Sequence, residues 1–313
     1  MALLPRVLAY AVAATSLVGA AQAQDDDERR IVMVTHGQAA DPFWSVVKKG
    51  AEDAADEVGA DLEYRAPTNF DVARMQQLVE AAIASEPDAL ILSLVDPDAL
   101  GDLAQEAADS GLPVIVINTG GHVADEYGAD IFIGSDPKLA GKRAAERMIE
   151  DGAEKGLCIN QEQGNVALDL RCEGFEEGFD GNAEQLATGS DPTEIRNSLV
   201  AYLNQNSDVD ALLSLGPLAT DPIIDEMREQ GALEQFHFGT FDLSPTILEA
   251  LVAEEIDFAI DQQPYLQGYQ GVVTANQSAK HLLMPATDLL TGPAFVTPET
   301  AEEVQELTEK GVR

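Results

Sequence analysis

The sequence predicts an α/β protein of two lobes, each a doubly wound parallel sheet with helices on both faces. Short apolar runs rich in β-branched residues alternate with longer stretches in which apolar residues recur every three or four positions. This alternation runs through the first half of the chain and then starts again. Strands that alternate with helices are typical of a parallel sheet covered on both faces, so the restart indicates a second lobe.

The apolar runs give the order of the expected elements. Strands of the first lobe are expected at residues 31–34, 62–64, 89–92, 114–117 and 131–133. The intervening stretches have helical spacing, as in the recurrence of Val47, Ala51 and Ala54. Strands of the second lobe are expected at residues 157–159, 211–215, 236–238 and 258–260, and a final extended piece at residues 294–296 crosses back to it. Right-handed crossovers place the carboxyl ends of the strands along one edge of each sheet, where such sheets bind ligands.

The N-terminal segment predicts export. Arg6 precedes an apolar run from Val7 to Ala21, and Ala21-Gln22-Ala23 has the small residues that signal peptidase reads. We therefore expect residues 1–23 to be a signal peptide cleaved after Ala23. The run is too short to span a bilayer, so no membrane insertion is expected. A membrane anchor is the alternative, but the acidic stretch 25–28 favours a free mature terminus.

The charge balance excludes several partners. The chain has 56 acidic and 18 basic residues, a net charge of −38. Such a surface repels phosphates and anionic lipids, so neither nucleic acid nor membrane binding is expected. Because the acids are spread along the whole chain, we interpret them as a solvation device, as in proteins from saline habitats. The charge says little about a ligand.

Two cysteines, Cys158 and Cys172, lie fourteen residues apart. Disulfides persist outside the cytoplasm, so export makes one bridge plausible, with two buried free thiols as the alternative. Neither cysteine has a His or Cys neighbour at ligand spacing, and no metal site is expected.

Enzyme motifs are missing from the sequence. The turn after the first strand has a single glycine, and neither a phosphate-binding Gly-x4-Gly-Lys-Ser/Thr nor a Gly-x-Ser-x-Gly elbow occurs. The histidines are scattered, and only His36 lies at the carboxyl end of a strand. Without a nucleophile–base pair, we expect neither enzymatic activity nor a cofactor.

Polar and aromatic residues gather at the predicted strand ends. After the first strand, Asp41 is expected to cap a helix that begins at Pro42. Phe43 and Trp44 follow, and two adjacent large aromatics cannot both point into one core, so we expect at least one to stack on a ligand ring. The other candidates for ligand binding at strand ends are His36, Ser93, Asn118, Asp169, Arg171, Pro217, Ala219, Asp242 and Gln262. The alternative interpretation of Asp169 is an acid at a helix start, and that of Arg171 is a surface partner for the many acids.

The chain resembles the ribose-type periplasmic binding proteins of sugar ABC importers. The resemblance covers essentially the whole mature sequence and is carried by Asp41-Pro42-Phe43-Trp44, Pro113-Val114-Ile115 with Asn118, Gly134-Ser135-Asp136 with Gly141, Arg171 to Phe175, and Gly239-Thr240-Phe241-Asp242. It implies sugar contacts from Asp41, Phe43, Trp44, Ser93, Asn118, Asp169, Asp242 and Gln262.

The resemblance also implies an architecture and a role. The lobes would comprise residues 24–134 with 263–292 and residues 135–262 with 293–313, joined by a multi-crossover hinge. The protein would be a periplasmic monomer that closes on a sugar or polyol and delivers it to an ABC permease with its ATPase. With Asp41, Asp169 and Asp242 in the cleft, we expect a neutral ligand rather than a sugar acid or phosphate. Asp169 with residues 216–219 is more similar to receptors for the autoinducer-2 furanose. A chemotaxis receptor of the same fold and an exported sugar-modifying enzyme stay open as alternatives.

Overall fold

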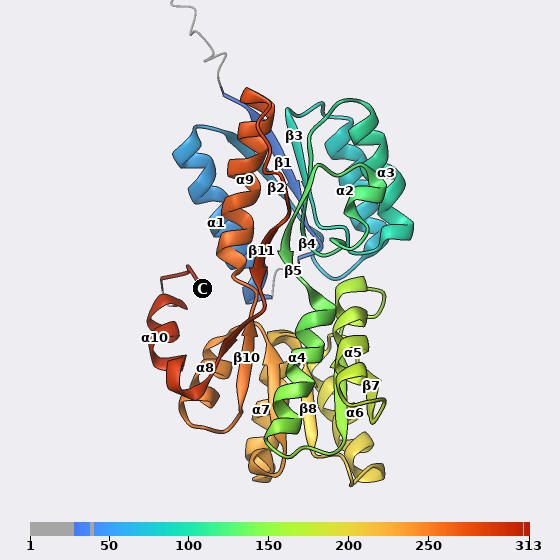
Figure 1. The fold of residues 1–313 in the computed structure, drawn as a ribbon, viewed down its shortest axis with the longest axis vertical. Helices are drawn as coiled ribbons and strands as arrows, with labels where there is room; N and C mark the ends of the chain where they lie inside the picture. The colour runs from blue at the N-terminus through green and yellow to red at the C-terminus, as the bar shows by residue number, and fades with distance from the viewer. Residues whose placement is uncertain (1–27, 38–40, 309) are drawn as a thin grey trace, which may run out of the picture.

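A computed structural model describes residues 28–37, 41–308 and 310–313. Two lobes lie end to end along the long axis of the molecule, and each is built on a six-stranded sheet (Figure 1). The predicted signal peptide lies outside the described residues. Within the described part of the chain, no helix has the length and apolar character that crossing a membrane requires.

The first sheet is parallel throughout and has the strand order β11-β5-β4-β3-β1-β2. Its strands are β1 (Arg30–Val34), β2 (Asp61–Arg65), β3 (Ala89–Leu92), β4 (Val114–Asn118), β5 (Ile131–Ser135) and β11 (Leu289–Gly292). One face packs on α1 (Pro42–Val58) and α9 (Pro264–His281), and the other on α2 (Val72–Ile83) and α3 (Pro97–Asp109). A 3-10 helix, η1 (Ala124–Tyr127), precedes β5.

The second sheet repeats this plan with the order β12-β10-β9-β8-β6-β7. Its strands are β6 (Gly156–Asn160), β7 (Ala183–Ala187), β8 (Ala211–Ser214), β9 (His237–Phe241), β10 (Phe258–Asp261) and β12 (Ala294–Val296). One face packs on α4 (Pro137–Glu150) and α5 (Val166–Gly178). The other packs on α6 (Pro192–Gln205), α7 (Pro217–Gln230), α8 (Pro245–Val252) and α10 (Pro298–Thr308); η2 (Leu233–Gln235) precedes β9.

The observed sheets confirm the predicted fold class and differ from the expectation in detail. β12 runs antiparallel to β10, so the second sheet is not wholly parallel. Two strands were not predicted, β7 and β11, and both lie at or near the outer edge of a sheet. Because edge strands are partly exposed, β7 (AEQLA) does not have the continuous apolar run of a central strand.

The chain passes between the sheets three times within the described residues. The crossings follow β5, follow β10, and join β11 to β12. After the second crossing α9 packs against α1, β3 and β4 of the first lobe. Three neighbouring crossings leave the lobes connected at one edge of each sheet, which is the arrangement of a hinge.

Close packing of α4 on α5 fixes the helix that follows β6. A Cβ at Gly141 would lie 1.9 Å from the backbone oxygen of Arg171, and one at Gly174 would lie 2.0 Å from that of Lys138. Only glycine permits this approach. A disulfide between Cys158 of β6 and Cys172 of α5 adds a covalent tie to the same helix, so the position of α5 relative to the second sheet is fixed.

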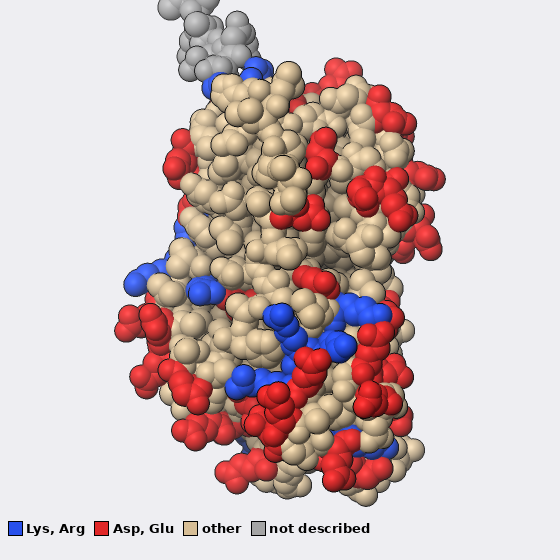
Figure 2. All heavy atoms as spheres, in the orientation of Figure 1, with Lys and Arg blue, Asp and Glu red and all other residues tan. Residues whose placement is uncertain are grey.

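Acidic side chains cover both lobes (Figure 2). Basic residues gather on one face of the second lobe, over the region of α4, which carries Lys138, Lys142, Arg143 and Arg147. The spread of acids agrees with a role in solvation.

Candidate ligand-binding cleft

A cavity lies between the lobes at the carboxyl ends of strands from both sheets. Its volume is about 30 Å³, room for about two water molecules. Eight predicted residues line it: His36, Asp41, Phe43, Trp44, Asn118, Arg171, Asp242 and Gln262. The topology therefore brings together residues up to 226 positions apart in the sequence (262 − 36) at one place.

The wall from the first lobe begins at the end of β1. Asp41 caps α1, and its Oδ1 accepts a hydrogen bond of 3.0 Å from the backbone N–H of Phe43, as predicted. The ring of Trp44 packs edge-on against His36 at 4.7 Å and against Phe43 at 5.1 Å between centroids.

Both aromatics of this wall belong to the core of the first lobe. Phe43 and Trp44 are 5% and 6% exposed and lie in the same apolar cluster. Contrary to the expectation, two adjacent aromatics share this core, because edge-to-face packing accommodates both rings. The cavity borders this cluster, so both residues also line the cleft.

A chain of hydrogen bonds forms the wall from the second lobe. Arg171 donates from Nη1 to the backbone oxygen of Leu215 at 3.1 Å and from Nη2 to Oε1 of Gln262 at 2.8 Å. Gln262 Nε2 in turn lies 2.8 and 3.0 Å from the two carboxylate oxygens of Asp242. The Arg171 guanidinium stacks on Phe241, 4.1 Å from its centroid. These contacts hold three polar side chains in fixed orientations at the cavity.

Two cavity residues have unusual backbone conformations. Asn118 has φ 65° and Asp242 has φ 62°, in the left-handed region that Asn and Asp tolerate better than other side chains. Each lies at or just after the end of a strand, β4 or β9. Such conformations cluster at functional sites, which supports a binding role for this cleft.

Burial strongly perturbs the titratable groups of the cavity. It raises the pKa of Asp41 to about 8, with repulsion from Glu162 and Asp242 adding to the shift. It raises the pKa of Asp242 to about 7, against the attraction of Arg171. Burial also lowers the pKa of His36 to about 3, helped by Arg171, so His36 is neutral. At pH 7 these shifts favour the uncharged forms of Asp41 and His36 in the cavity.

Four predicted residues do not line the cavity. Ser93 lies behind His36, and its Oγ accepts a hydrogen bond of 3.0 Å from the His36 backbone N–H. Asp169 is exposed and bonds Asn160. Pro217 and Ala219 are buried in the first turn of α7, while the preceding Leu215 and Gly216 line the cavity instead.

Helical periodicity explains the position of Asp169. Asn165, Leu168 and Arg171 follow one another at three-residue spacing, lie on one side of the start of α5, and line the cavity. Asp169 is one position past Leu168, which turns it away from this face. Applied to α5, the same periodicity would have selected Leu168 over Asp169 from the sequence.

Gln161 and Glu162 also line the cavity and were not predicted. Both lie in the turn between β6 and α5 and are almost fully buried. Glu162 Oε2 accepts a hydrogen bond of 2.8 Å from Asn165 Nδ2. The only signal in the sequence was their place directly after a strand, because a turn has no periodicity that shows which side chains point inward.

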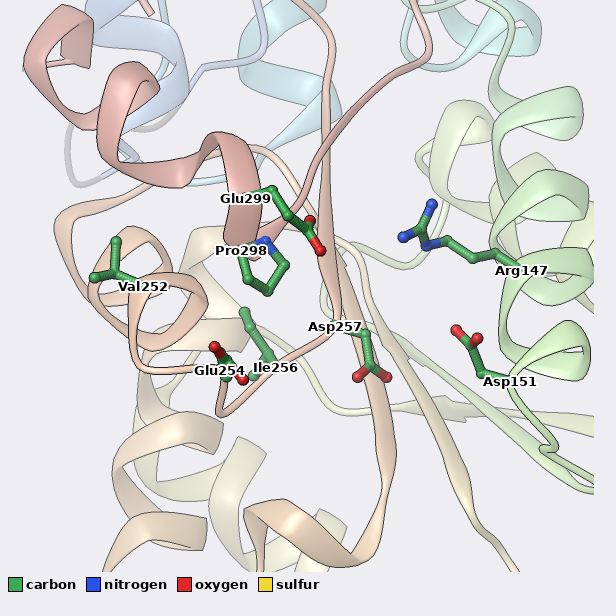
Figure 3. Close-up of a pocket in the computed structure, with 8 residues that line it drawn as sticks. All are labelled: Arg147, Asp151, Val252, Glu254, Ile256, Asp257, Pro298 and Glu299. Carbon is green, nitrogen blue, oxygen red and sulfur yellow. The ribbon is translucent and has the colours of Figure 1, made fainter.

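A larger cavity, of about 400 Å³, lies wholly within the second lobe (Figure 3). Arg147 and Asp151 line one side, facing Asp257 and Glu299. Asp257 immediately precedes β10, so this cavity lies at the amino end of that strand. Ligands of open parallel sheets bind at the carboxyl ends, and the interlobe cavity is therefore the candidate site. Among the described residues, no group of three or more His, Cys, Asp or Glu side chains could hold a metal ion.

Comparison with known proteins places the chain in a family. A sequence model described as the periplasmic binding protein domain matches residues 31–282. The chain belongs to the periplasmic binding protein family. The match spans most of both lobes, so the family resemblance expected from the sequence is confirmed.

Relatives within the periplasmic binding protein family include sugar-binding proteins. The xylose/arabinose-binding protein XylF of Sulfolobus acidocaldarius is 25% identical over 77% of this chain, which spans 63% of the length of that relative. A putative rhizopine-binding protein of Rhizobium meliloti is 25% identical over 77% of this chain and 81% of its own length. The structure of a carbohydrate transporter from Acidothermus cellulolyticus in complex with myo-inositol is 29% identical, with a TM-score of 0.86 over 91% of this chain and 100% of that one.

Proposed function

We propose that this protein is the periplasmic solute-binding component of an ABC importer and that it captures a neutral sugar or polyol by closing its lobes. The observation that carries the proposal is the cavity between the lobes, lined from both sides by hydrogen-bonding side chains and by two aromatics. Aromatic faces pack on the C–H faces of sugar rings, and amides and carboxyls bond hydroxyls. Relatives that bind xylose, arabinose and myo-inositol support this class of ligand.

The size of the cavity supports a hinge mechanism. About 30 Å³ accommodates a few waters at most, so a sugar enters only when the lobes separate. A ligand that contacts both lobes would then shift the population from the open form toward a form closed around it. The closed protein would then dock on the permease, with the ATPase supplying the energy.

The charges of the cavity disfavour anionic ligands. Asp41, Glu162 and Asp242 line it, against Arg171 as the cation. The three carboxyl groups outnumber the one guanidinium, so a polyhydroxylated molecule without negative charge fits better than a sugar acid or sugar phosphate.

A thermal-shift screen over pentoses, hexoses, polyols and furanose signals tests the proposal. At least one neutral member is expected to raise the melting temperature, because a ligand that binds only the folded protein stabilises it. Recovery of that compound unchanged after incubation separates a carrier from an exported enzyme. A screen in which no polyhydroxylated compound raises the melting temperature would contradict the proposed function.

A further inference from the structure

The charges that face the cavity do not balance. The titratable side chains on its lining are Asp41 from the first lobe, Glu162, Arg171 and Asp242 from the second, and the neutral His36. Ionised, they would leave acids in excess over the one guanidinium. This excess is built into a site that closure removes from water.

The Arg171 guanidinium directs its bonds to neutral acceptors. Nη1 bonds the Leu215 carbonyl, Nη2 bonds the Gln262 amide oxygen, and the guanidinium plane covers Phe241. Asp242 takes its hydrogen bonds from Gln262. Arg171 therefore attracts the acids at a distance, and its Nε has no hydrogen-bond partner among the described residues. With three carboxyl groups and one guanidinium on the lining, the cavity keeps capacity for a second cation.

A buried acceptor on a residue of the cavity lining also has no hydrogen-bond donor in the described part of the chain. Gln161 is 7% exposed and lines the cavity, and its Oε1 has no hydrogen-bond partner among the residues that the structure describes. An unsatisfied buried acceptor costs about 1–3 kcal/mol. A ligand group that brings several donors would satisfy it, and an ammonium brings three donors and no acceptor.

The acids come from opposite lobes. Asp41 is fixed at the start of α1, whereas Glu162 and Asp242 follow β6 and β9. Closure brings carboxyl groups of the two lobes to the same small cavity, and like charges in a desolvated site repel. A cation between them turns this repulsion into attraction, and so favours the closed form over the open one.

We propose that the preferred ligand is an amino-substituted polyol, a sugar or cyclitol in which a protonated amine replaces one hydroxyl. This inference rests on the proposed function, because hydroxyl recognition by the same cleft supplies the remaining contacts. The net charge of −38 favours it further, since an acidic protein raises the local concentration of cations and speeds their association.

Calorimetric titration of matched ligand pairs at pH 7 tests the inference. The probes are D-glucose with D-glucosamine, and myo-inositol with a mono-amino-deoxy inositol. In at least one pair, the amine is expected to bind ten times or more tightly than its hydroxyl parent. The amine should also release protons on binding, because burial and neighbouring acids raise the pKa of Asp41 to about 8 and a cation favours its ionised form. Titration in buffers of different ionisation enthalpy measures that release.

Two variants identify where the preference arises. Glu162→Gln removes one cavity carboxylate and is expected to lower the ratio of amine to parent affinity about tenfold. Glu176→Gln makes the same charge change at an exposed position on α5 and should leave the ratio unchanged. Circular dichroism establishes that both variants are folded. The comparison of amine and parent affinities on the wild-type protein does not depend on either variant.

The outcomes separate this inference from the proposed function. If a neutral polyol binds and its amine binds equally or less tightly, the inference is wrong while the proposed function stands. If no member of either pair binds and the wider screen is also negative, both are contradicted. If the two variants lower the preference for the amine equally, the preference comes from the overall charge of the protein, and its assignment to the cavity is overturned.

Discussion

The side-chain amide of Asn165 lies 3.3 Å from Nε2 of His36, so the two lobes touch across the cleft. Asn165 Oδ1 caps α5 by accepting from Ala167 N–H, which leaves its Nδ2 to face His36. His36 Nε2 is then an acceptor, and Nδ1–H donates to Ser93 Oγ at 2.8 Å. A backbone hydrogen bond of 3.1 Å from Val166 N to Val95 O lies beside this contact. The structure thus represents the closed form.

Removing the Asn165 contact should favour opening. Asn165→Ser keeps a residue that caps helices well but is too short to reach His36. We expect the unliganded variant to have a larger radius of gyration than wild type in small-angle X-ray scattering. Thr193→Ser, on the distant α6, is the matched control and should scatter like wild type. Identical scattering from Asn165→Ser would show that this contact does not hold the lobes together.

The unliganded closed form should become less stable as pH rises from about 6.5 to 8. In the closed cavity the pKa of Asp41 is raised to about 8 and that of Asp242 to about 7, so closure holds protons that exposed carboxyls release near pH 4. The free energy that these bound protons contribute to closure is lost as pH rises through the raised pKa values. His36, with its pKa lowered to about 3, acts in the opposite direction but only below about pH 6.5.

Scattering at a series of pH values measures this effect. The radius of gyration of the unliganded wild type should increase between pH 6.5 and 8.5. Asp41→Asn keeps a good helix cap and removes one titrating group, so its increase should be smaller. If the radius of gyration of Asp41→Asn depends on pH as that of wild type does, Asp41 is not a source of the effect.

Arg171 should be replaceable by lysine only at a large loss of ligand affinity. One ammonium cannot bond the Leu215 carbonyl and Gln262 while lying flat on Phe241. Gln262 and Asp242 would then lose their fixed orientation. We expect Arg171→Lys to weaken binding about tenfold to a hundredfold, the range of one charged hydrogen bond. The control Arg228→Lys changes a surface residue that pairs with Glu255 and should bind ligand as wild type does. If Arg171→Lys also bound with wild-type affinity, the guanidinium would not be needed to orient the cleft.

The sequence was a good guide to strand ends and a poor one to the turn and helix beyond them. His36, Asn118, Asp242 and Gln262 lie at or just after the ends of inner strands, and parallel topology alone brings such positions to one edge. Their placement needed no knowledge of side-chain packing.

The misplaced and missed residues depend on orientation within a turn or helix. Asp169 is turned away by one helical position, and Glu162 enters the cavity from a turn whose backbone the sequence does not specify. The acid at a strand end is also often a cap: Asp96 and Asp136 bond backbone N–H groups of their own helices. Polar residues at strand ends therefore predict where a cleft lies better than which atoms face it.

Trp44 should report ligand binding directly. It is the only tryptophan of the chain and lines the cavity, so its fluorescence should change on titration with ligand. Trp44→Ala should abolish the ligand-induced thermal shift, and it should also destabilise the fold by about 3–5 kcal/mol because the ring is buried. Met75→Ala, in the core on the opposite face of the same sheet, should lower stability yet keep the shift. A shift that survives in Trp44→Ala would show that the ring does not contact ligand.

A crystal structure with the tightest ligand from the screen tests the central claim most directly. We expect the molecule to lie between the lobes, within hydrogen-bond distance of Asp41 on one side and of Asp242 or Arg171 on the other. A ligand bound to one lobe alone, or in the cavity lined by Arg147 and Asp257, would contradict capture by closure of the cleft.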